Sequence, residues 1–223
     1  MLVTRVLSAL VLAPIAIAAV YFGGWLFAAF WALAAVAVLW EWIGLVGLRN
    51  YGWVAVGVLY ALVMFLAPVV LRGRADAQLG MTAIFLLFAI VWTTDIVGYF
   101  AGRAIGGPKL APSISPKKTW SGAIAGLVVA VLIVVLASRF VPHAKISVLV
   151  ALTTLLSIVS QAGDLAESAL KRRFDAKDAS QIIPGHGGVM DRLDGFWAAT
   201  LCAAIIGVAR GGFAEPGRGL LIW

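Results

Sequence analysis

The chain has 223 residues, of which 63% are hydrophobic and only 12% are charged, and its mean hydropathy is +1.04. No water-soluble domain of this length hides so much apolar surface, so the composition excludes a soluble fold. The net charge of +7 would suggest nucleic acid in a soluble protein, but the chain has no base-reading motif and no aromatic-basic platform, so we exclude that partner.

Runs of about 20 apolar residues follow one another along the chain, and continuous runs are typical of helices that span a bilayer. We therefore predict an all-α polytopic membrane protein with about seven transmembrane helices in one integral domain, residues 1–223. The N-terminal helices occupy 1–91, a part with two polar loops occupies 92–209, and a tail occupies 210–223. The predicted spans are Val6–Phe22, Trp25–Gly47, Trp53–Leu71, Leu79–Phe100, Trp120–Ser138, Ile146–Leu170 and Leu193–Ala209.

The first span has some features of a secretory signal, namely Arg5, an apolar run and the triplet Ala16-Ile17-Ala18. The apolar run continues through Val20-Tyr21-Phe22, however, and a further span follows directly. We therefore expect this segment to be retained as a transmembrane helix.

Two polar segments, Ala101–Thr119 and Lys171–Asp191, interrupt the apolar runs and are separated by two spans, so they share one side of the membrane. Together with Arg192 they hold nine basic residues, whereas the connection Arg139–Lys145 on the opposite side holds two. Lys and Arg are enriched in cytoplasmic loops. We therefore predict a multi-pass protein of the cell (inner) membrane whose polar segments and N-terminus face the cytoplasm and whose C-terminus lies outside.

The first candidate residues are carboxylates inside apolar helices and the polar stretch that follows. Glu41 lies between two tryptophans in the second span, and we expect it to form a structural pair. Asp95, Tyr99 and Arg103 recur every four residues, and Asp95 is either functional or half of a buried ion pair. The stretch Ser115-Pro-Lys117-Lys118-Thr119 places hydroxyls and lysines before a helix start, which suits phosphate. The alternative is membrane anchoring, which needs only the lysines.

A second group begins where the sixth span ends. Asp164, Glu167, Ser168 and Lys171 are spaced so that they form one polar stripe along a helix. A helix that emerges from the membrane, with basic residues at its C-terminus, explains the lysine. It does not explain Asp164, because a carboxylate inside the membrane face needs a partner.

A glycine-rich turn and two aspartates follow. The turn Pro184-Gly-His186-Gly187-Gly188 allows left-handed backbone angles and exposes N–H groups to an anion, although a plain loop is the alternative. Capping of the next helix would need only one of Asp191 and Asp194. Two aspartates, with Asp164 and Asp178 nearby, suit Mg²⁺, which binds few carboxylates together with substrate phosphates. The combination predicts a phosphoryl- or nucleotidyl-transfer site.

These residues resemble the signature of the phosphatidate cytidylyltransferase family, also called CDP-diacylglycerol synthases. Upstream blocks are similar as well, so that the resemblance covers residues 92–197. The family often has Glu after the Lys-Lys-Thr-x block, whereas this chain has Ser121 before Gly122, so no role of that Glu is carried over. The matching positions are Ser168-x-x-Lys171-Arg172, Lys177-Asp178, Pro184-x-His186-Gly187-Gly188-x-x-Asp191-Arg192-x-Asp194, Gln161-x-Gly163-Asp164, Ser115–Thr119, and Asp95 with Tyr99 and Gly102-Arg103.

The resemblance implies an enzyme that transfers CMP from CTP to phosphatidate in the membrane, giving CDP-diacylglycerol and pyrophosphate, with 92–209 as its catalytic part. It implies Mg²⁺ held by Asp164, Asp191 and Asp194, and it leaves open a second cation and a homodimer. The implied catalytic residues are Asp164, Lys171, Arg172, Lys177, Asp178, His186, Asp191, Arg192 and Asp194. The implied phosphate-binding residues are Arg103, Ser115, Lys117, Lys118, Thr119, Gly187 and Gly188.

Two other functions compete with this interpretation. A CDP-alcohol phosphatidyltransferase would place its aspartates at four-residue steps after an Asp-Gly…Ala-Arg opening, whereas Asp191 and Asp194 are three apart and that opening is missing. A transporter or channel with Asp95, Glu41 and Asp164 as ion ligands would place charge near the membrane midplane, between interrupted helices. Charge in this chain concentrates at the predicted cytoplasmic helix ends, which favours nucleotidyl transfer.

Overall fold

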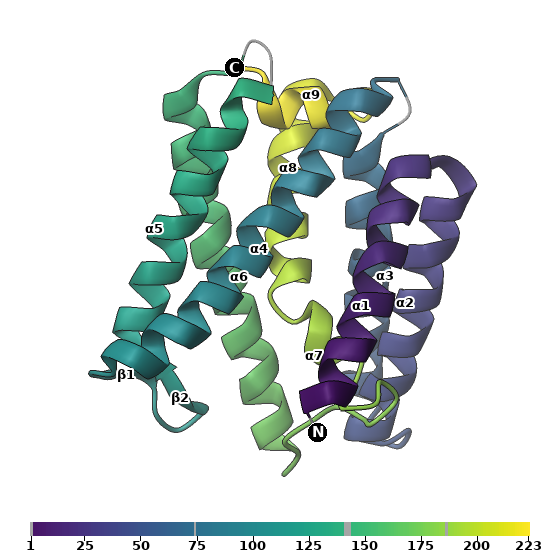
Figure 1. Ribbon diagram of the computed structural model, residues 1–223. Helices are drawn as coiled ribbons and strands as arrows, with labels where there is room; N and C mark the ends of the chain where they lie inside the picture. The colour runs from purple at the N-terminus through teal and green to yellow at the C-terminus, as the bar shows by residue number, and fades with distance from the viewer. Residues whose placement is uncertain (1, 74, 141–143, 186) are drawn as a thin grey trace.

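The computed structural model describes residues 2–73, 75–140, 144–185 and 187–223. The described chain is mostly helical, as predicted, and its helices form one bundle (Figure 1). Two short antiparallel strands and a turn of 3-10 helix were not predicted. The elements are α1 Leu2–Phe22, α2 Gly24–Val46, α3 Tyr51–Arg72, α4 Ala77–Ile105, β1 Lys109–Ala111, β2 Ser115–Thr119, α5 Trp120–Ala137, the 3-10 turn Ser138–Phe140, α6 Ile146–Arg173, α7 Met190–Leu193, α8 Phe196–Gly211 and α9 Pro216–Leu221.

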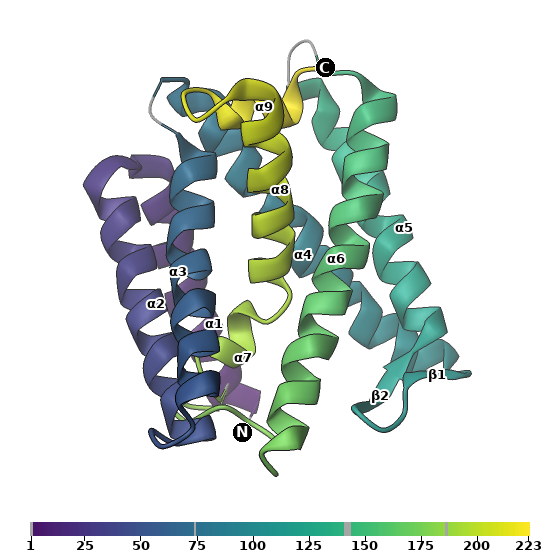
Figure 2. The same cartoon turned by 180° about the vertical axis from the view of Figure 1, so that it is seen from behind.

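The bundle has two sides that α4 joins (Figures 1 and 2). Helices α1, α2 and α3 form one side, and α5 and α6 form the other. Helix α4 crosses obliquely between them, and α8 and α9 lie in the middle. The β1–β2 hairpin, α7 and the start of α1 are at one end of the bundle, whereas α9 and the C-terminus are at the other. The two polar segments therefore meet at one end, as their separation by two spans predicts.

Five helices are long and apolar enough to cross a membrane: α2, α3, α4, α5 and α6. They correspond to the second to sixth predicted spans. The first and seventh predicted spans correspond to shorter apolar stretches of the described chain, Leu10–Phe22 and Phe196–Gly211. Many large apolar side chains on the outside of the bundle are exposed, among them Leu33, Leu59 and Leu132. A surface of this kind suits contact with lipid rather than with water.

The seventh predicted span, Leu193–Ala209, is not one continuous helix. The chain forms the short α7, turns at Asp194-Gly195 and starts α8 at Phe196. The backbone at Gly195 packs closely on α6, because a Cβ atom placed there would lie 2.8 Å from Ser160 Oγ. The break places Asp194 at the turn between the two helices, instead of on a helix face.

Side chains at the helix starts and glycines at the turns define the connections. Asp76 accepts a hydrogen bond from Leu79 N at 3.0 Å and so caps α4, and Thr119 accepts one from Gly122 N at 3.2 Å and so caps α5. The turn between α1 and α2 has φ values of 64° and 56° at Gly23 and Gly24, which are readily accessible only to glycine.

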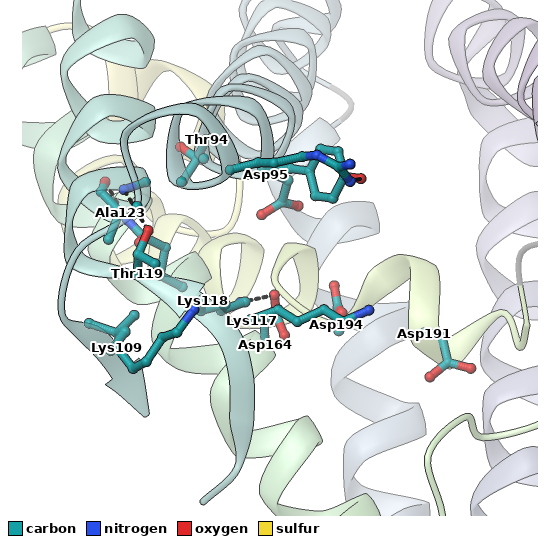
Figure 3. A pocket seen from close by; sticks show the side chains of 18 of the residues that line it. Thr94, Asp95, Lys109, Lys117, Lys118, Thr119, Ala123, Asp164, Asp191 and Asp194 are labelled. Carbon is teal, nitrogen blue, oxygen red and sulfur yellow. Dashed lines mark hydrogen bonds and ion pairs between the residues drawn. The ribbon is translucent and has the colours of Figure 1, made fainter. Parts of the chain in front are cut away.

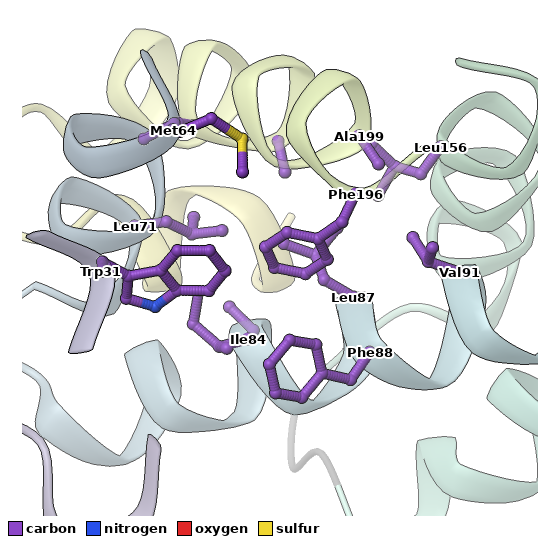
Figure 4. Packing of buried hydrophobic residues seen from close by; sticks show 14 of the residues in the cluster. Trp31, Met64, Leu71, Ile84, Leu87, Phe88, Val91, Leu156, Phe196 and Ala199 are labelled. Carbon is purple, nitrogen blue, oxygen red and sulfur yellow. The ribbon is translucent and has the colours of Figure 1, made fainter. Parts of the chain in front are cut away.

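An aromatic cluster at the centre of the bundle fixes the start of α8 (Figure 4). The rings of Trp31 in α2 and Phe196 in α8 are stacked, with centroids 5.2 Å apart and planes 7° apart. Phe88 in α4 lies 5.1 Å from the Phe196 ring. Stacked aromatic pairs add stability beyond the area that they bury. Because Phe196 follows Asp194 by two residues, this packing also holds Asp194 at the end of the bundle where the polar segments meet.

Candidate active site

A cavity of about 620 Å³ opens at the end of the bundle that carries the β1–β2 hairpin and α7 (Figure 3). Helices α4 and α6, the hairpin, the start of α5 and the α7 segment all contribute to its lining. We call residues 94–123 the hairpin wall and residues 179–195 the turn wall. The lining residues are Thr94, Asp95, Gly98, Tyr99, Gly102, Arg103, Gly106, Lys109, Leu110, Lys117, Lys118, Thr119, Gly122, Ala123, Gln161, Asp164, Asp191, Arg192 and Asp194.

Close packing of glycines holds the hairpin wall together. Gly98 and Gly102 of α4 face Gly122 and Gly126 of α5, and in each helix the two glycines are four residues apart. A Cβ atom on Gly122 would lie 2.4 Å from the Gly98 carbonyl oxygen, and one on Gly126 would lie 2.4 Å from the Thr94 carbonyl oxygen. Small residues at this spacing let membrane helices approach closely. The contact brings the end of α4 and the start of α5 to the same cavity.

The hairpin places its lysines beside the acidic residues. Its strands are antiparallel, with Lys109 opposite Thr119. Lys118 forms an ion pair with Asp164 of α6. Lys109 and Lys117 also line the cavity, and both are exposed. Together with Arg103, these lysines make up four of the five basic residues that line the cavity.

Two serines of this region, unlike the lysines, do not line the cavity. Ser115, expected to bind phosphate, is not among the residues that line the cavity. Ser121, which stands near the position where the resembling family often has Glu, donates a hydrogen bond to the Gly106 carbonyl and contacts the Thr119 hydroxyl at 3.0 Å. Ser121 therefore closes the loop that leads from α4 into the hairpin.

Four aspartates line the cavity, and three of them are Asp95 in α4, Asp164 in α6 and Asp194 in the turn between α7 and α8 (Figure 3). The Asp164 carboxylate accepts a hydrogen bond from Ser168 Oγ at 3.3 Å in addition to its pairing with Lys118. That of Asp194 accepts one from Gly195 N at 2.8 Å. Burial, followed by the negative charges of Asp164, Glu167 and Asp95, raises the pKa of Asp194 well above its ordinary value.

This arrangement fits a cation that takes only part of its coordination from the protein. Among the described residues, no three Asp, Glu, His or Cys side chains lie close enough together to enclose a metal ion. Mg²⁺ usually keeps several waters and binds through one or two carboxylates plus substrate phosphates. Burial is the main cause of the raised pKa of Asp194, and a bound cation would relieve the smaller part that comes from the neighbouring carboxylates. Asp164 and Asp194 are therefore the residues that fit Mg²⁺ best.

Asp191 lines the same cavity, but its carboxylate has other partners. Oδ1 accepts a hydrogen bond from Lys171 Nζ at 2.5 Å, and Oδ2 accepts from Ala179 N at 2.9 Å and Gly188 N at 2.8 Å. Lys171 is itself only 6% exposed and also pairs with Glu167 at 3.1 Å. Lys171, which the resemblance implies to be catalytic, is therefore not among the residues that line the cavity. The expected metal contact of Asp191 stays a prediction, and its surroundings favour a supporting role.

The glycine turn does not present the free N–H groups that its sequence suggested. Gly187 N donates to the Ile183 carbonyl at 3.1 Å, and Gly188 N donates to Asp191. Both N–H groups thus have acceptors within the protein, and their expected contact with a phosphate stays a prediction that requires the turn to rearrange. The aspartate three residues beyond the turn occupies the place that an external anion would take.

The remaining predicted residues are distributed around the site. Arg192 lines the cavity, whereas Arg172 is exposed and donates to the Ala176 carbonyl at 2.7 Å. Lys177 and Asp178 are exposed and not among the lining residues. His186 lies outside the described residues.

Glu41 is the residue whose role sequence reasoning missed. Instead of pairing with a basic side chain, it accepts hydrogen bonds from Ser180 and from two backbone N–H groups of the turn wall. The only signal in the sequence is a carboxylate inside an apolar helix. Nothing in the sequence indicates which of the distant loops that carboxylate meets.

Residues 49–209 match the model of a family described as the cytidylyltransferase family. A protein of Brucella suis is 52% identical over 165 residues, which cover 74% of this chain and 59% of the relative. One of Rickettsia bellii is 37% identical over 202 residues, covering 85% of this chain and 84% of the relative. One of Bacillus subtilis is 46% identical over 123 residues, covering 53% and 45%. All three are named phosphatidate cytidylyltransferase. This chain spans about 59% of the length of the Brucella relatives that it matches.

Proposed function

Because this chain belongs to the cytidylyltransferase family, we propose that it is a phosphatidate cytidylyltransferase. It transfers CMP from CTP to phosphatidate and so forms CDP-diacylglycerol and pyrophosphate. The observation that carries this proposal is the cavity itself, which is lined by four aspartates and five basic residues. Both substrates are polyanions, and a single cavity that joins these two sets of groups can bring them together.

The reaction is a displacement at the α-phosphorus of CTP. An oxygen of the lipid phosphate forms a bond to that phosphorus, the bond to the bridging oxygen of the β-phosphate breaks, and pyrophosphate leaves. The lipid phosphate is ionised near neutral pH, since the second pKa of a phosphomonoester is about 6. The chain therefore has to hold and align phosphates and does not have to supply a strong general base.

The basic residues divide between the two walls. Lys109, Lys117 and Lys118 of the hairpin wall bind the phosphates of CTP, and Arg192 of the turn wall contacts the lipid phosphate or the triphosphate from the opposite side. Asp164 and Asp194 would hold Mg²⁺, which when bound neutralises charge on phosphate oxygens. Lys118 pairs with Asp164, so Lys118 must release that carboxylate in order to bind a phosphate.

The placement of the cavity suits a membrane substrate. With α1 and α8 as further spans, seven helices cross the cell membrane and the cavity end faces the cytoplasm, because the basic residues gather there. CTP then enters from the water, and phosphatidate presents its head group from the bilayer. A second cation and a homodimer remain predictions.

The test is product formation by purified chain in lipid nanodiscs. Labelled CTP becomes chloroform-extractable only when phosphatidate and Mg²⁺ are both present. Omission of either one, or replacement of phosphatidate by diacylglycerol, abolishes the signal. If the wild-type chain forms no extractable product under these conditions but moves an ion across liposomes, the transport interpretation replaces this one.

A further inference from the structure

We propose that Glu41 is a positioning residue for the active site, and that its buried carboxylate holds the turn wall in the place from which Arg192 and Asp194 reach the cavity. Glu41 lies in α2 and precedes the stretch, residues 49–209, that matches the family model. It does not line the cavity. Only the activity measurement below rests on the proposed function, because the contact between Glu41 and the turn wall does not depend on the reaction.

The Glu41 carboxylate makes its contacts with a segment about 140 residues further along the chain. Oε1 accepts hydrogen bonds from Ser180 Oγ at 2.6 Å and Val189 N at 2.8 Å, and Oε2 accepts one from Met190 N at 2.7 Å. The side chain is 1% exposed. Within the described chain no salt bridge involves Glu41, so these three donors stabilise its charge. A buried carboxylate requires such partners, and the contact is therefore expected to be specific.

Two carboxylates hold the turn from opposite sides. Gly188 N donates to Asp191, and the next two N–H groups, those of Val189 and Met190, donate to Glu41. Asp191 is tied through Lys171 to α6, whereas Glu41 belongs to α2. The turn is thus held between the two sides of the bundle, and Arg192 and Asp194 follow within four residues of Met190.

The two adjacent positions of the turn, 187 and 188, require glycine for different physical reasons. Gly187 has a φ of 88°, a value that other residues rarely adopt. Gly188 is not in that region, but a Cβ atom on it would lie 2.6 Å from Glu41 Oε1 and 2.8 Å from Glu41 Oε2. Gly188 therefore makes room for the Glu41 carboxylate. This difference supplies an internal control for the proposal.

The first test is a double-mutant cycle on turnover. Gly188→Ala alone is expected to lower kcat about tenfold or more, because its methyl group displaces the Glu41 carboxylate. In a Glu41→Ala background the same change is expected to lower kcat less than about twofold further, because the group it clashes with is gone. Gly187→Ala, the matched control, is expected to lower kcat by a similar factor in both backgrounds. Equal effects of Gly188→Ala in both backgrounds overturn the proposal.

The second test does not depend on turnover and uses a variant that keeps the size of the side chain. In Glu41→Gln, one oxygen acceptor becomes an N–H₂ donor that faces other donors, so hydrogen exchange of the 189 and 190 amides should accelerate about tenfold. Glu215→Gln, which changes a partly exposed carboxylate paired with Arg218, is the matched control and should leave those amides unchanged. Unchanged exchange in Glu41→Gln overturns the proposal. If the wild-type chain lacks the transferase activity, the proposed function fails, and amide exchange still decides the role of Glu41.

Discussion

The hairpin wall is held by contact between helix backbones, whereas the turn wall is held by carboxylates that bind backbone N–H groups. Gly98, Gly102, Gly122 and Gly126 leave no space between α4 and α5. On the other side of the cavity, Glu41 and Asp191 hold a segment with little regular structure between α2 and α6. A site with both walls in one membrane bundle can therefore depend on close backbone packing on one side and on buried charge on the other.

The largest effect should come from the two carboxylates of the proposed Mg²⁺ site. Asp164→Asn and Asp194→Asn remove one negative charge each from the proposed Mg²⁺ site, so turnover should fall at least about 100-fold. Both variants should keep the wild-type thermal unfolding midpoint to within a few degrees. Asp175→Asn is the control, because Asp175 is exposed with a φ of 54° that asparagine tolerates. Near-normal turnover in either variant at limiting Mg²⁺ removes that residue from the proposed site.

The packing of the hairpin wall can be broken by one methyl group. Gly122→Ala places a Cβ atom 2.4 Å from the Gly98 carbonyl oxygen and forces α4 and α5 apart. We expect a loss of about 1–3 kcal/mol in stability, measured as a lower unfolding midpoint, together with lower turnover. Gly44→Ala in α2 is the matched control, since a Cβ atom there meets nothing within 4 Å. An unchanged midpoint in Gly122→Ala contradicts the proposed basis of the hairpin wall.

Lys118 links the hairpin wall to the acidic residues. Lys118→Met removes a phosphate-binding charge and frees Asp164 from its ion pair. We expect the KM for CTP to rise about tenfold, while the Mg²⁺ concentration for half-saturation falls. Lys109→Met, which lacks that ion pair, should raise the KM for CTP without lowering the Mg²⁺ requirement. A higher Mg²⁺ requirement in Lys118→Met would show that the lysine does not compete with the cation.

The affinity of the proposed Mg²⁺ site should depend on pH. The raised pKa of Asp194 means that its neutral form persists to higher pH than that of an ordinary aspartate. A cation must displace that proton, so Mg²⁺ affinity should fall as the pH falls through this pKa. The measurement is the rise in unfolding midpoint that Mg²⁺ causes, at several pH values and without substrate. A rise that is independent of pH contradicts a direct contact between Asp194 and the cation.

The smallest effect should come from the end of the bundle opposite the cavity. Arg210 lies 3.8 Å from the centroid of the Trp223 ring and donates to the Gly219 carbonyl at 2.6 Å. Arg210→Ala should reduce stability by about 1 kcal/mol through loss of these contacts. Turnover at saturating CTP should stay within about twofold of wild type. A large loss of turnover would show that the two ends of the bundle are coupled.

Much of the hairpin wall could be predicted from local sequence. Apolar runs located the helices, and the lysines at 117 and 118 preceded a helix start, which Thr119 indeed caps. Asp95 was noticed because a carboxylate is rare in an apolar helix. The strands were not predicted, because three and five residues give too short a pattern.

The turn wall was harder to predict because its contacts are distant in sequence. The glycines and aspartates are evident in the sequence, but their hydrogen-bond partners are not. In the sequence, Gly188 resembles an anion-binding glycine. In the structure, it lies beside the carboxylate of Glu41, almost 150 residues earlier. Lys171 fits the basic end of a helix that emerges from the membrane, yet it is buried and paired with Asp191 and Glu167. Composition and spacing carry no information about which loop a distant carboxylate meets.

The most direct test of nucleotidyl transfer at this cavity follows the two ends of the CTP triphosphate separately. CTP labelled at the α-phosphorus and CTP labelled at the γ-phosphorus are each supplied with phosphatidate and Mg²⁺ to wild-type chain and to Asp164→Asn. We predict that in the wild type the α-label enters the chloroform-soluble lipid and the γ-label is released into water as pyrophosphate. In the variant, both labels should stay in water as unreacted CTP. Transfer of the γ-label to lipid, or equal transfer of the α-label by the variant, would contradict attack at the α-phosphorus in this site.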